Sequence, residues 1–292
     1  MRVEPVTGHI SLVHGEKDGV FPGSHSILIL GEETVLVDTG CGIKDLKRLR
    51  DEYDVSYVIN SHTHPDHSAG NWVFGDRPIH VPEEGFDTSG DDIALAGRFV
   101  GREVSAVFRD FIKKAMGFRN CRPTNSYNGR TVFDFGGTTL EPIYTPGHTK
   151  DHYCFFEPGE GILFSFDYDL TSFPWYGHRE SSIPQFRESV EQLKALCPKV
   201  VVPSHREIVT EDIDAEFDNF CQILDKRAER ILSLLGGGKN LAQLVECAPI
   251  YGSFPYAEPL LRYWEGQMIA KHLEQLELDG MVKRHGDLYF KN

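Results

Sequence analysis

The stretch SHTHPDH, residues 61–67, decides the fold of this chain. It places three imidazoles and one carboxylate within six residues, a density typical of a metal-ligand set and not of a histidine-rich surface turn. An apolar, β-branched segment, 56–60, comes directly before it. The ligand-type side chains are therefore expected at the exposed end of a buried strand, held rigidly but open to a substrate.

The order of residues within the stretch predicts two neighbouring metal positions. In an extended backbone, His62 and His64 point to the same side and can bind one ion together. Pro65 has no N–H to continue the strand, so the chain turns there. Asp66 and His67 then project in a new direction, toward a second ion. This ligand set suits zinc, and equally iron or manganese.

The whole chain has the composition of a globular protein. Its 292 residues, 40% hydrophobic and 25% charged, allow one large domain or a main domain with a small one. No apolar run approaches the roughly 20 residues that span a bilayer, and residues 1–5 lack an apolar signal core. The six cysteines form no C-x-x-C pair, which favours free thiols. We therefore expect a cytoplasmic protein without a membrane partner.

The net charge of −14 at pH 7 bears on possible partners. A strongly acidic chain is repelled by phosphate backbones, which argues against a nucleic-acid partner without excluding a local basic groove. A small-molecule substrate is the expected partner.

Two strand-rich halves, each with helices, predict two sheets packed together with helices on the outer faces. The first half reads as strands 10–14, 26–30, 34–38 and 56–60. The second reads as strands 131–135, 139–144, 152–156, 161–166 and 199–203. Residues 1–235 are expected to form the main domain.

Residues 85–130 interrupt this strand pattern with apolar residues at helical spacing. Residues 91–130 hold eight Lys or Arg against four acids, a local positive excess in an acidic chain. A solvated helix face explains this excess. The alternative is a lid or wall that attracts an anionic substrate, through Arg98, Arg102 and Arg109.

A Gly-Gly-Gly run at 236–238 marks a second boundary. Residues 239–292 are expected to form a small helical module with a terminal hairpin. Its aromatic residues predict packing either on the core or on a second copy of the chain, which would make a homo-oligomer. They are Tyr251, Phe254, Tyr256, Tyr263 and Trp264.

Three further ligand-type residues follow apolar strands, as the 61–67 stretch does. His148 lies in Thr-Pro-Gly-His-Thr at 145–149, Asp167 follows 161–166, and His205 follows Val-Val-Val-Pro-Ser at 200–204.

Together, H-x-H-x-D-H, T-P-G-H-T, the later Asp and the P-S-H resemble the metallo-β-lactamase-fold hydrolases, over roughly residues 8–210. The resemblance implies an αββα sandwich with two metal ions, most typically zinc, at one edge. It assigns His62, His64 and His148 to one metal, and Asp66, His67 and His205 to the other, with Asp167 as the bridge. Asp38, in Leu-Val-Asp-Thr-Gly, would orient the first motif.

Two departures from the family pattern, and the tail, qualify the resemblance. The last motif reads P-S-H-R, and Phe166 stands before Asp167 where a glycine is common; both leave the ligands intact and would reshape the pocket. Residues 240–292 are similar to the winged-helix-like tail of the lactamase-β-like endoribonucleases, without a diagnostic motif.

The leading functional hypothesis is a metal-dependent hydrolase that uses a metal-bound hydroxide on a small thioester, lactone or related ester, like glyoxalase II or the lactonases. Asp66 is the candidate catalytic residue: it would orient the hydroxide and pass a proton to the leaving group. A metal-dependent endoribonuclease or phosphodiesterase is the alternative that the tail favours. A mononuclear iron dioxygenase on the same fold is the third.

Other polar residues are candidates for positions around the metals. His178 and Tyr176 lie in the segment after Asp167 and are expected to line the pocket. His152, four residues after His148, is a candidate for contact with a ligand. His25 is a weaker one. The remaining histidines are interpreted as structural or surface residues: His9, His14, His80, His272 and His285.

Overall fold

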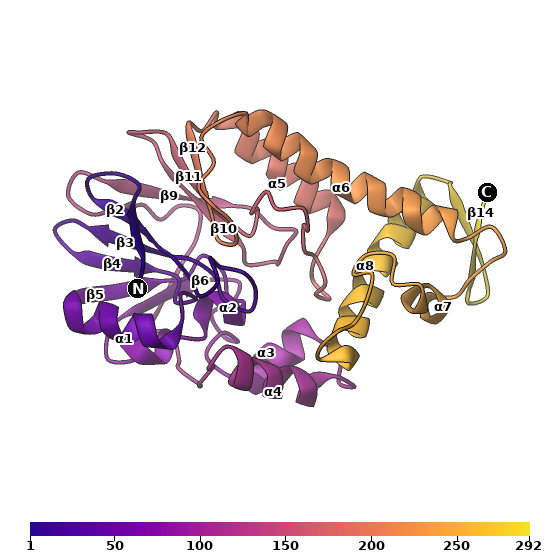
Figure 1. Cartoon of the computed structure of the whole chain (residues 1–292), viewed down its shortest axis with the longest axis horizontal. Coiled ribbons are helices and arrows are strands. Elements are labelled where there is room, and N and C mark those ends of the chain that lie inside the picture. The colour runs from indigo at the N-terminus through magenta and orange to yellow at the C-terminus, as the bar shows by residue number, and fades with distance from the viewer.

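Two β-sheets form the main body of the protein, as the computed structural model of residues 1–292 shows (Figure 1). The first sheet has seven strands, arranged in the order in which they occur in the chain. The strands β4, β5, β6 and β7 are parallel to one another, and the others are antiparallel. Its strands are β1 (Val3–Pro5), β2 (Ile10–Val13), β3 (Ser26–Leu30), β4 (Thr34–Val37), β5 (Val55–Ile59), β6 (Ile79–Pro82) and β7 (Asn125–Tyr127).

The second sheet has five strands, in the spatial order β12-β11-β10-β9-β8. The pair β11 and β12 is parallel, and the other pairs are antiparallel. Its strands are β8 (Phe133–Asp134), β9 (Thr139–Tyr144), β10 (Tyr153–Glu157), β11 (Ile162–Phe166) and β12 (Val200–Pro203).

Alternation along the strands decides which side chains fill the space between the sheets. In β3, Ile27 and Ile29 belong to the core between the two sheets, whereas Leu28 belongs to the core on the outer face. Neighbouring strands repeat this two-residue period, as an extended backbone with both faces covered requires. From the second sheet, Phe155 and Phe164 pack into the shared core.

Helices cover the outer face of each sheet and complete the sandwich. Helix α1 (Ile43–Glu52) packs Leu46 and Leu49 against the first sheet. Two helices, α5 (Ile183–Ala195) and the long α6 (Ile213–Ser233), cover the second. The αββα sandwich that the sequence predicts is confirmed.

The predicted helical interruption is present as two helices. These are α3 (Asp92–Phe99) and α4 (Ser105–Ala115), separated by the segment that contains Gly101. They lie side by side below the sandwich in Figure 1. Between β5 and β6, the chain forms α2 (Pro65–Ser68) and the short 3-10 helix η1 (Asn71–Phe74).

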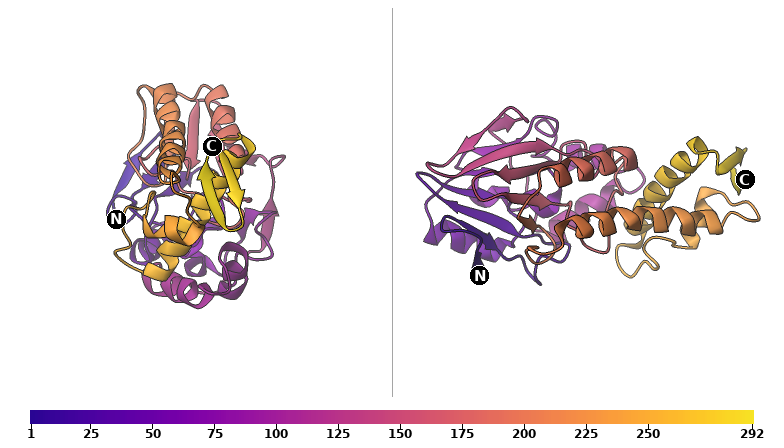
Figure 2. Two further views of the ribbon diagram at one scale, coloured as in Figure 1. Left: turned by 90° about the vertical axis from the view of Figure 1, so that its right-hand side faces the viewer. Right: turned by 90° about the horizontal axis from the view of Figure 1, so that it is seen from above.

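The C-terminal residues form α7 (Leu241–Glu246), α8 (Glu258–Leu278) and the hairpin β13 (Val282–His285) and β14 (Leu288–Lys291). The long α6 runs from the sandwich out to this module (Figures 1 and 2). Met268 and Leu273 of α8 share a core with Phe220 and Leu224 of α6, and α8 also contacts α4. None of the helices is long and apolar enough to cross a membrane.

Candidate metal centre

Four loops at one edge of the sandwich bring the predicted ligands together. Strands β9 and β11 are both antiparallel to β10, and β12 is parallel to β11, so the carboxyl ends of these three strands meet at one edge. The loop after β5 reaches the same place, where Pro65 begins α2. The residues that these loops supply are His62, His64, Asp66 and His67 after β5, His148 after β9, Asp167 after β11 and His205 after β12.

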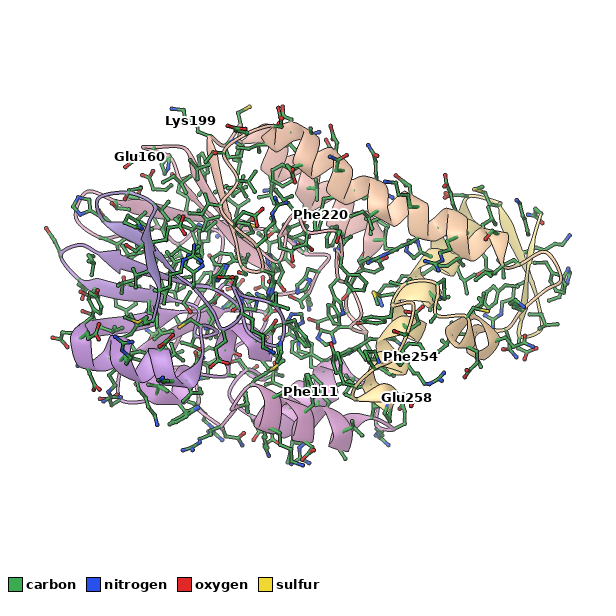
Figure 3. All side chains as sticks on the ribbon, viewed as in Figure 1. Phe111, Glu160, Lys199, Phe220, Phe254 and Glu258 are labelled. Atoms are coloured by element: carbon green, nitrogen blue, oxygen red, sulfur yellow. The ribbon has the colours of Figure 1, made fainter.

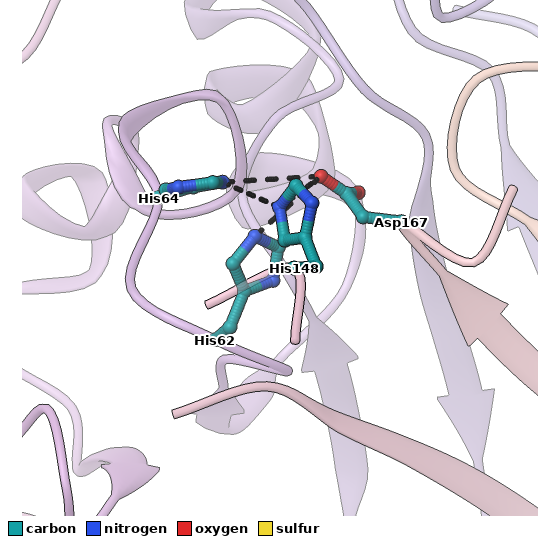
Figure 4. Close-up of side chains that lie close together, drawn as sticks. All are labelled: His62, His64, His148 and Asp167. Carbon is teal, nitrogen blue, oxygen red and sulfur yellow. Dashed lines mark hydrogen bonds and ion pairs between the residues drawn. The ribbon is translucent and has the colours of Figure 1, made fainter. Parts of the chain in front are cut away.

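One group of ligand atoms surrounds Oδ2 of Asp167 (Figure 4). Nε2 of His148 lies 2.9 Å from this oxygen, Nε2 of His62 lies 3.6 Å from it, and Nδ1 of His64 lies 3.9 Å from it. All four residues are buried.

The second group surrounds the other carboxylate oxygen of Asp167, Oδ1. Nε2 of His67 lies 2.8 Å from it and Nε2 of His205 lies 3.3 Å from it. Oδ2 of Asp66 stands 3.8 Å from His205 and 3.9 Å from His67. Asp167 therefore belongs to both groups, one oxygen to each.

The residues fit two small divalent cations. Ligand atoms about 2.0–2.2 Å from a tetrahedral zinc ion stand roughly 3–4 Å from one another. The ligand atoms of each group here lie within 4.8 Å of one another. Three buried ligand atoms make no hydrogen bond: Nε2 of His62, Nε2 of His67 and Oδ1 of Asp167. The second and third of these atoms are 2.8 Å apart. Unpaired buried polar atoms are costly, so lone pairs directed at a common point indicate a cation site.

Hydrogen bonds behind the ligands orient their rings. Nδ1 of His148 donates to the carbonyl of Trp175 at 2.8 Å, and Nδ1 of His205 donates to the carbonyl of Gly19 at 2.7 Å. Nδ1 of His67 donates to Asp38 at 2.8 Å. Because these acceptors take the N–H, each of the three rings presents Nε2 as a lone pair to the site.

Asp38 also accepts from the backbone and the hydroxyl of Ser61, at 2.8 and 2.7 Å, and so fixes the start of the 61–67 stretch. The resemblance to the metallo-β-lactamase-fold hydrolases implies an orienting role for Asp38, and these contacts show which atoms would perform it.

The electrostatic field of the ligand groups favours positive charge between them. Burial raises the pKa of Asp167, but His67, His148 and His205 outweigh it and hold this pKa well below its usual range. Burial lowers the pKa of His62 well below its ordinary value, which keeps this ring neutral. Burial also lowers the pKa of His205, but Asp167 raises it to about 9. The same negative field that favours a proton on His205 favours a metal cation.

A buried ion pair ties the insertion to the loops of the metal centre. Nη2 of Arg98, on α3, lies 2.7 Å from Asp151 and 2.5 Å from Glu180. Asp151 accepts from the hydroxyl of Thr63 at 2.5 Å, and this hydroxyl accepts from Arg98 at 2.9 Å. Thr63 lies between His62 and His64, so this network supports the ligand-bearing loop.

A cavity of about 400 Å³ opens onto the two ligand groups. We call its ligand-bearing end the floor, which consists of His64, Asp66, His148, Asp167 and His205. The helical walls come from α4 and the C-terminal module, and they consist of Phe108, Phe111, Ile112, Met116, Tyr251, Tyr256, Leu261 and Trp264. The remaining lining residues are Val20, Phe21, Pro65, Asp169, Thr171, Phe173, Trp175 and His178.

The structure places the two candidates after Asp167 differently. His178 lines the cavity: its ring stacks on Phe99 at 4.2 Å and lies 4.5 Å from the ring of His64. Tyr176 points away from the cavity, and its hydroxyl bonds with Nε2 of His272 at 2.7 Å. The expectation that Tyr176 lines the pocket is therefore wrong, because its hydroxyl is held on the far side by His272 of α8 and by Arg227 of α6, which donates to it at 3.0 Å.

His152, a candidate for contact with a ligand, lies behind the ring of His62. Its ring is 4.8 Å from that of His62, and its Nδ1 bonds with the hydroxyl of Thr145 at 2.9 Å. His25 is buried outside both ligand groups, where its Nδ1 accepts from the backbone of Gly15, and burial lowers its pKa to about 4. His14, expected to be structural or exposed, is buried against Glu4.

The two departures from the family pattern have local structural roles. Phe166 has a φ of 50°, in the left-handed region that favours glycine, and its ring is buried in the core between the sheets. Packing there offsets a backbone strain of about 1–3 kcal/mol. Arg206 bonds with the carbonyl of Leu170 at 2.6 Å and pairs with Glu216, so it anchors the loop after Asp167 and does not enter the cavity.

The insertion forms a wall of the cavity, but not a cationic one. Arg98 is paired with Asp151 and Glu180, and Arg109 is paired with Asp92. Arg102 is exposed to solvent. No Lys or Arg lines the cavity. The alternative of a basic lid over an anionic substrate therefore finds no support, because a count of charges along the sequence does not show which cations are already paired.

Sequence reasoning missed three features of the site: the Arg98–Asp151 pair, the segment of Val20 and Phe21, and the position of Asp169 in the lining. Asp151 and Asp169 stand close in sequence to His148 and Asp167, which is a signal that could have selected them. Nothing in the sequence connects Arg98 with Asp151.

Comparison with known proteins agrees with this geometry. The family model described as "Metallo-beta-lactamase superfamily" matches residues 19–205. The lactamase-like protein aptB of Emericella nidulans is 27% identical over 76% of this chain and 63% of its own length. The atrochrysone carboxyl ACP thioesterase dmxR1 of a Cryptosporiopsis species is 22% identical over 80% of this chain and 65% of its own length. The matched part of this chain therefore spans less than two thirds of the length of each of these two curated relatives.

Among solved structures, a metallo-beta-lactamase family protein from Thermus thermophilus superposes with a TM-score of 0.74 and 22% identity, over 99% of this chain and 100% of the other. A beta-lactamase domain protein from Burkholderia ambifaria superposes with a TM-score of 0.73 and 17% identity, over 99% of this chain and 93% of the other. These similarities establish a shared fold. With the family match across most of the sandwich, the chain belongs to the metallo-beta-lactamase superfamily.

Proposed function

We propose that this protein is a metal-dependent hydrolase of a carboxylic thioester or a related ester. The observation that carries the proposal is the pair of ligand groups that share Asp167 at the floor of a cavity large enough for a small molecule. The relative dmxR1, named a thioesterase, supports this class of substrate. Cleavage breaks the bond between the acyl carbon and sulfur, forms a bond to the oxygen of water, and leaves a carboxylic acid and a thiol.

The proposed ligands are the seven residues that the sequence singles out, three histidines on one ion, Asp66 with two histidines on the other, and Asp167 on both. Zinc fits this set of imidazole and carboxylate ligands. Two such divalent ions would lower the pKa of a bound water molecule and polarise the carbonyl group under attack. The chain itself fixes the geometry, because Asp38, Gly19 and the carbonyl of Trp175 hold the rings from behind.

Asp66 is the proposed proton carrier. Its carboxylate lines the cavity and lies within 4 Å of His67 and His205. Oδ2 of Asp66 would orient the attacking water, accept its proton and deliver it to the leaving sulfur or oxygen. No serine or cysteine nucleophile is needed for this reaction.

The two competing functions receive less support. A phosphodiester chain requires cations along its path, and no Lys or Arg lines the cavity. A mononuclear iron dioxygenase needs one ion, whereas seven ligands form two groups here. The similarity of residues 239–292 to a winged helix, and the division into a catalytic domain 1–235 with that module, stay predictions.

The test is a hydrolysis screen of thioester, lactone, phosphodiester and RNA substrates, combined with metal analysis of the purified protein. We expect close to two ions per chain and turnover of the thioester or ester substrates. Efficient RNA cleavage without ester turnover would replace the proposal by the nuclease alternative. One iron per chain and no second metal would favour the dioxygenase.

A further inference from the structure

We propose that the cavity binds a neutral, bulky apolar acyl group, such as an arylacetyl group, and discriminates against acyl groups that carry a negative charge. This inference rests on the proposed function and names the substrate class of the same site. It differs from the small anionic substrate that a basic lid would attract, which was one of the two interpretations of the charge of the insertion.

The shape and chemistry of the cavity carry the inference. All eight residues of the helical walls are apolar or aromatic, and Phe21, Phe173 and Trp175 extend this surface toward the floor. Twelve of the 21 lining residues are hydrophobic. A volume of about 400 Å³ lies within the range of roughly 300–1,000 Å³ that holds drug-sized ligands, and it exceeds what an acetyl or lactoyl group would fill.

The aromatic side chains that form this surface are held by one another. Trp175 donates a hydrogen bond to the hydroxyl of Tyr251 at 2.8 Å, and its ring meets that of Trp264 edge to face at 5.5 Å. Phe111 of α4 stacks on Phe21 at 5.9 Å. Figure 3 labels Phe111 at α4, to the left of Phe254 and Glu258 of the C-terminal module. Preorganised aromatic walls favour a rigid ring over a flexible polar chain.

Charge discriminates in the same direction. The lining includes three carboxylates, Asp66, Asp167 and Asp169, and no Lys or Arg. Asp66 and Asp167 lie at the floor, where the proposed cations offset them, but the helical walls supply no cation. A carboxylate carried deep on the acyl group would lose its hydration and find no partner.

The experiment compares three thioesters of N-acetylcysteamine that differ only in the acyl group: acetyl, (4-methylphenyl)acetyl and (4-carboxyphenyl)acetyl. All three have a saturated carbon next to the carbonyl, and rates are normalised to their hydrolysis by hydroxide. We expect kcat/KM for the methylphenyl compound to exceed that of the acetyl compound by roughly 100-fold, since apolar burial contributes about fourfold per methylene-sized group and burial of about half of the added ring corresponds to three or four such groups. The carboxyphenyl compound has nearly the same shape as the methylphenyl compound, and its kcat/KM should be lower by at least about tenfold.

Matched variants place the preference in the cavity. Phe111→Arg adds a cation to a wall residue that is partly exposed, and should narrow or invert the preference between the methyl and carboxyl compounds. Ile93→Arg adds the same cation to the other helix of the insertion, at a side chain that is 61% exposed and outside the lining, and should leave the preference unchanged.

Each outcome decides between the two proposals. Hydrolysis of all three thioesters with equal efficiency, or with a preference for the carboxylate, overturns the apolar substrate and leaves the hydrolase proposal intact. If no ester is cleaved, the hydrolase proposal fails. The cavity is then tested with the neutral fluorophore N-phenyl-1-naphthylamine: saturable binding that Phe111→Arg weakens and Ile93→Arg does not supports an apolar ligand, and its absence overturns it.

Discussion

The floor and the helical walls of the cavity come from different parts of the chain and have opposite chemistry. The floor is polar, and its residues are fixed at strand ends of the sandwich, with hydrogen bonds behind them. The walls are apolar, and they belong to segments added outside the sandwich, the insertion with α4 and the C-terminal module with α8. The comparison separates the site into a reaction centre that the fold provides and a binding surface that the added helices provide.

The largest effect is expected from Asp167→Asn, which removes a ligand of both groups. We expect about half of the bound metal or less to remain, and hydrolysis to fall by roughly 10³-fold, about 4 kcal/mol in transition-state stabilisation. Metal analysis and kcat measurements check this. Asp169→Asn is the matched control for metal content, which should stay unchanged because Asp169 lies two residues along and outside both groups. An unchanged metal content in Asp167→Asn would remove the proposed bridge.

Arg98→Ala tests the junction between wall and floor. It leaves Asp151, which is fully buried, without its main cation, and a lone buried charge costs about 3 kcal/mol or more. Chemical denaturation should show this loss in the free energy of unfolding, whereas Arg102→Ala on the exposed side of the insertion should stay within about 0.5 kcal/mol. Equal stability of the two variants would show that the network is not a structural junction.

The same pair predicts a pH dependence. Burial raises the pKa of Asp151, but Arg98 outweighs it and holds this pKa well below its usual range. A carboxylate with a lowered pKa in the folded state contributes stability that is present above its ordinary value of about 4 and is lost as the pH falls further. The difference in stability between the unchanged protein and Arg98→Ala should therefore shrink below about pH 4. A difference that grows there would contradict the assignment.

Asp38→Asn tests the support of the floor without touching a ligand. Asparagine tolerates the backbone φ of 59° at this position, but its amide cannot accept both from His67 and from Ser61 as the carboxylate does. We expect metal affinity to fall by roughly 10–100-fold in a chelator competition. The same change at Asp54, an exposed side chain paired with Arg77, should leave the affinity unchanged.

The smallest effect is expected from Tyr251→Phe, in a wall. The change removes the acceptor of the Trp175 indole and should cost about 1 kcal/mol in the free energy of unfolding, with metal content unchanged. Tyr256→Phe, at a half-exposed side chain of the same wall, is the control for losing a hydroxyl. Loss of metal in Tyr251→Phe would mean that wall and floor are not independent.

The ligand residues of the floor could be predicted from the sequence, whereas the residues that form the walls of the cavity could not. The spacing of His62, His64, Asp66 and His67 after a β-branched segment has a chemical meaning by itself, and the strand order brings the other ligands to the same edge. The order of strands and helices in the two halves of the chain was also sufficient to predict two sheets covered by helices. The helical period of Phe108 and Phe111 showed only that these side chains turn away from water.

What those apolar side chains face depends on contacts between distant segments. Phe111 and Tyr251 line one cavity although about half of the chain separates them, and no local pattern connects them. The charge of the insertion was misleading for the same reason, because Asp92 and Asp151 neutralise Arg109 and Arg98 inside the fold. The prediction that Tyr176 lines the pocket was wrong because the direction of its side chain depends on the conformation of an irregular segment.

One short segment near the N-terminus joins the two regions, and this constrains how the protein could acquire new substrates. The carbonyl of Gly19 holds His205, while Phe21, two residues on, lines the cavity. At Gly19, φ is 75° and an added Cβ would come within 2.7 Å of His25 and of the Ser204 carbonyl. Changes in this segment would alter selectivity and reaction centre together, whereas α4 contributes no ligand. Adaptation to a differently shaped acyl group is therefore expected to proceed through α4 first.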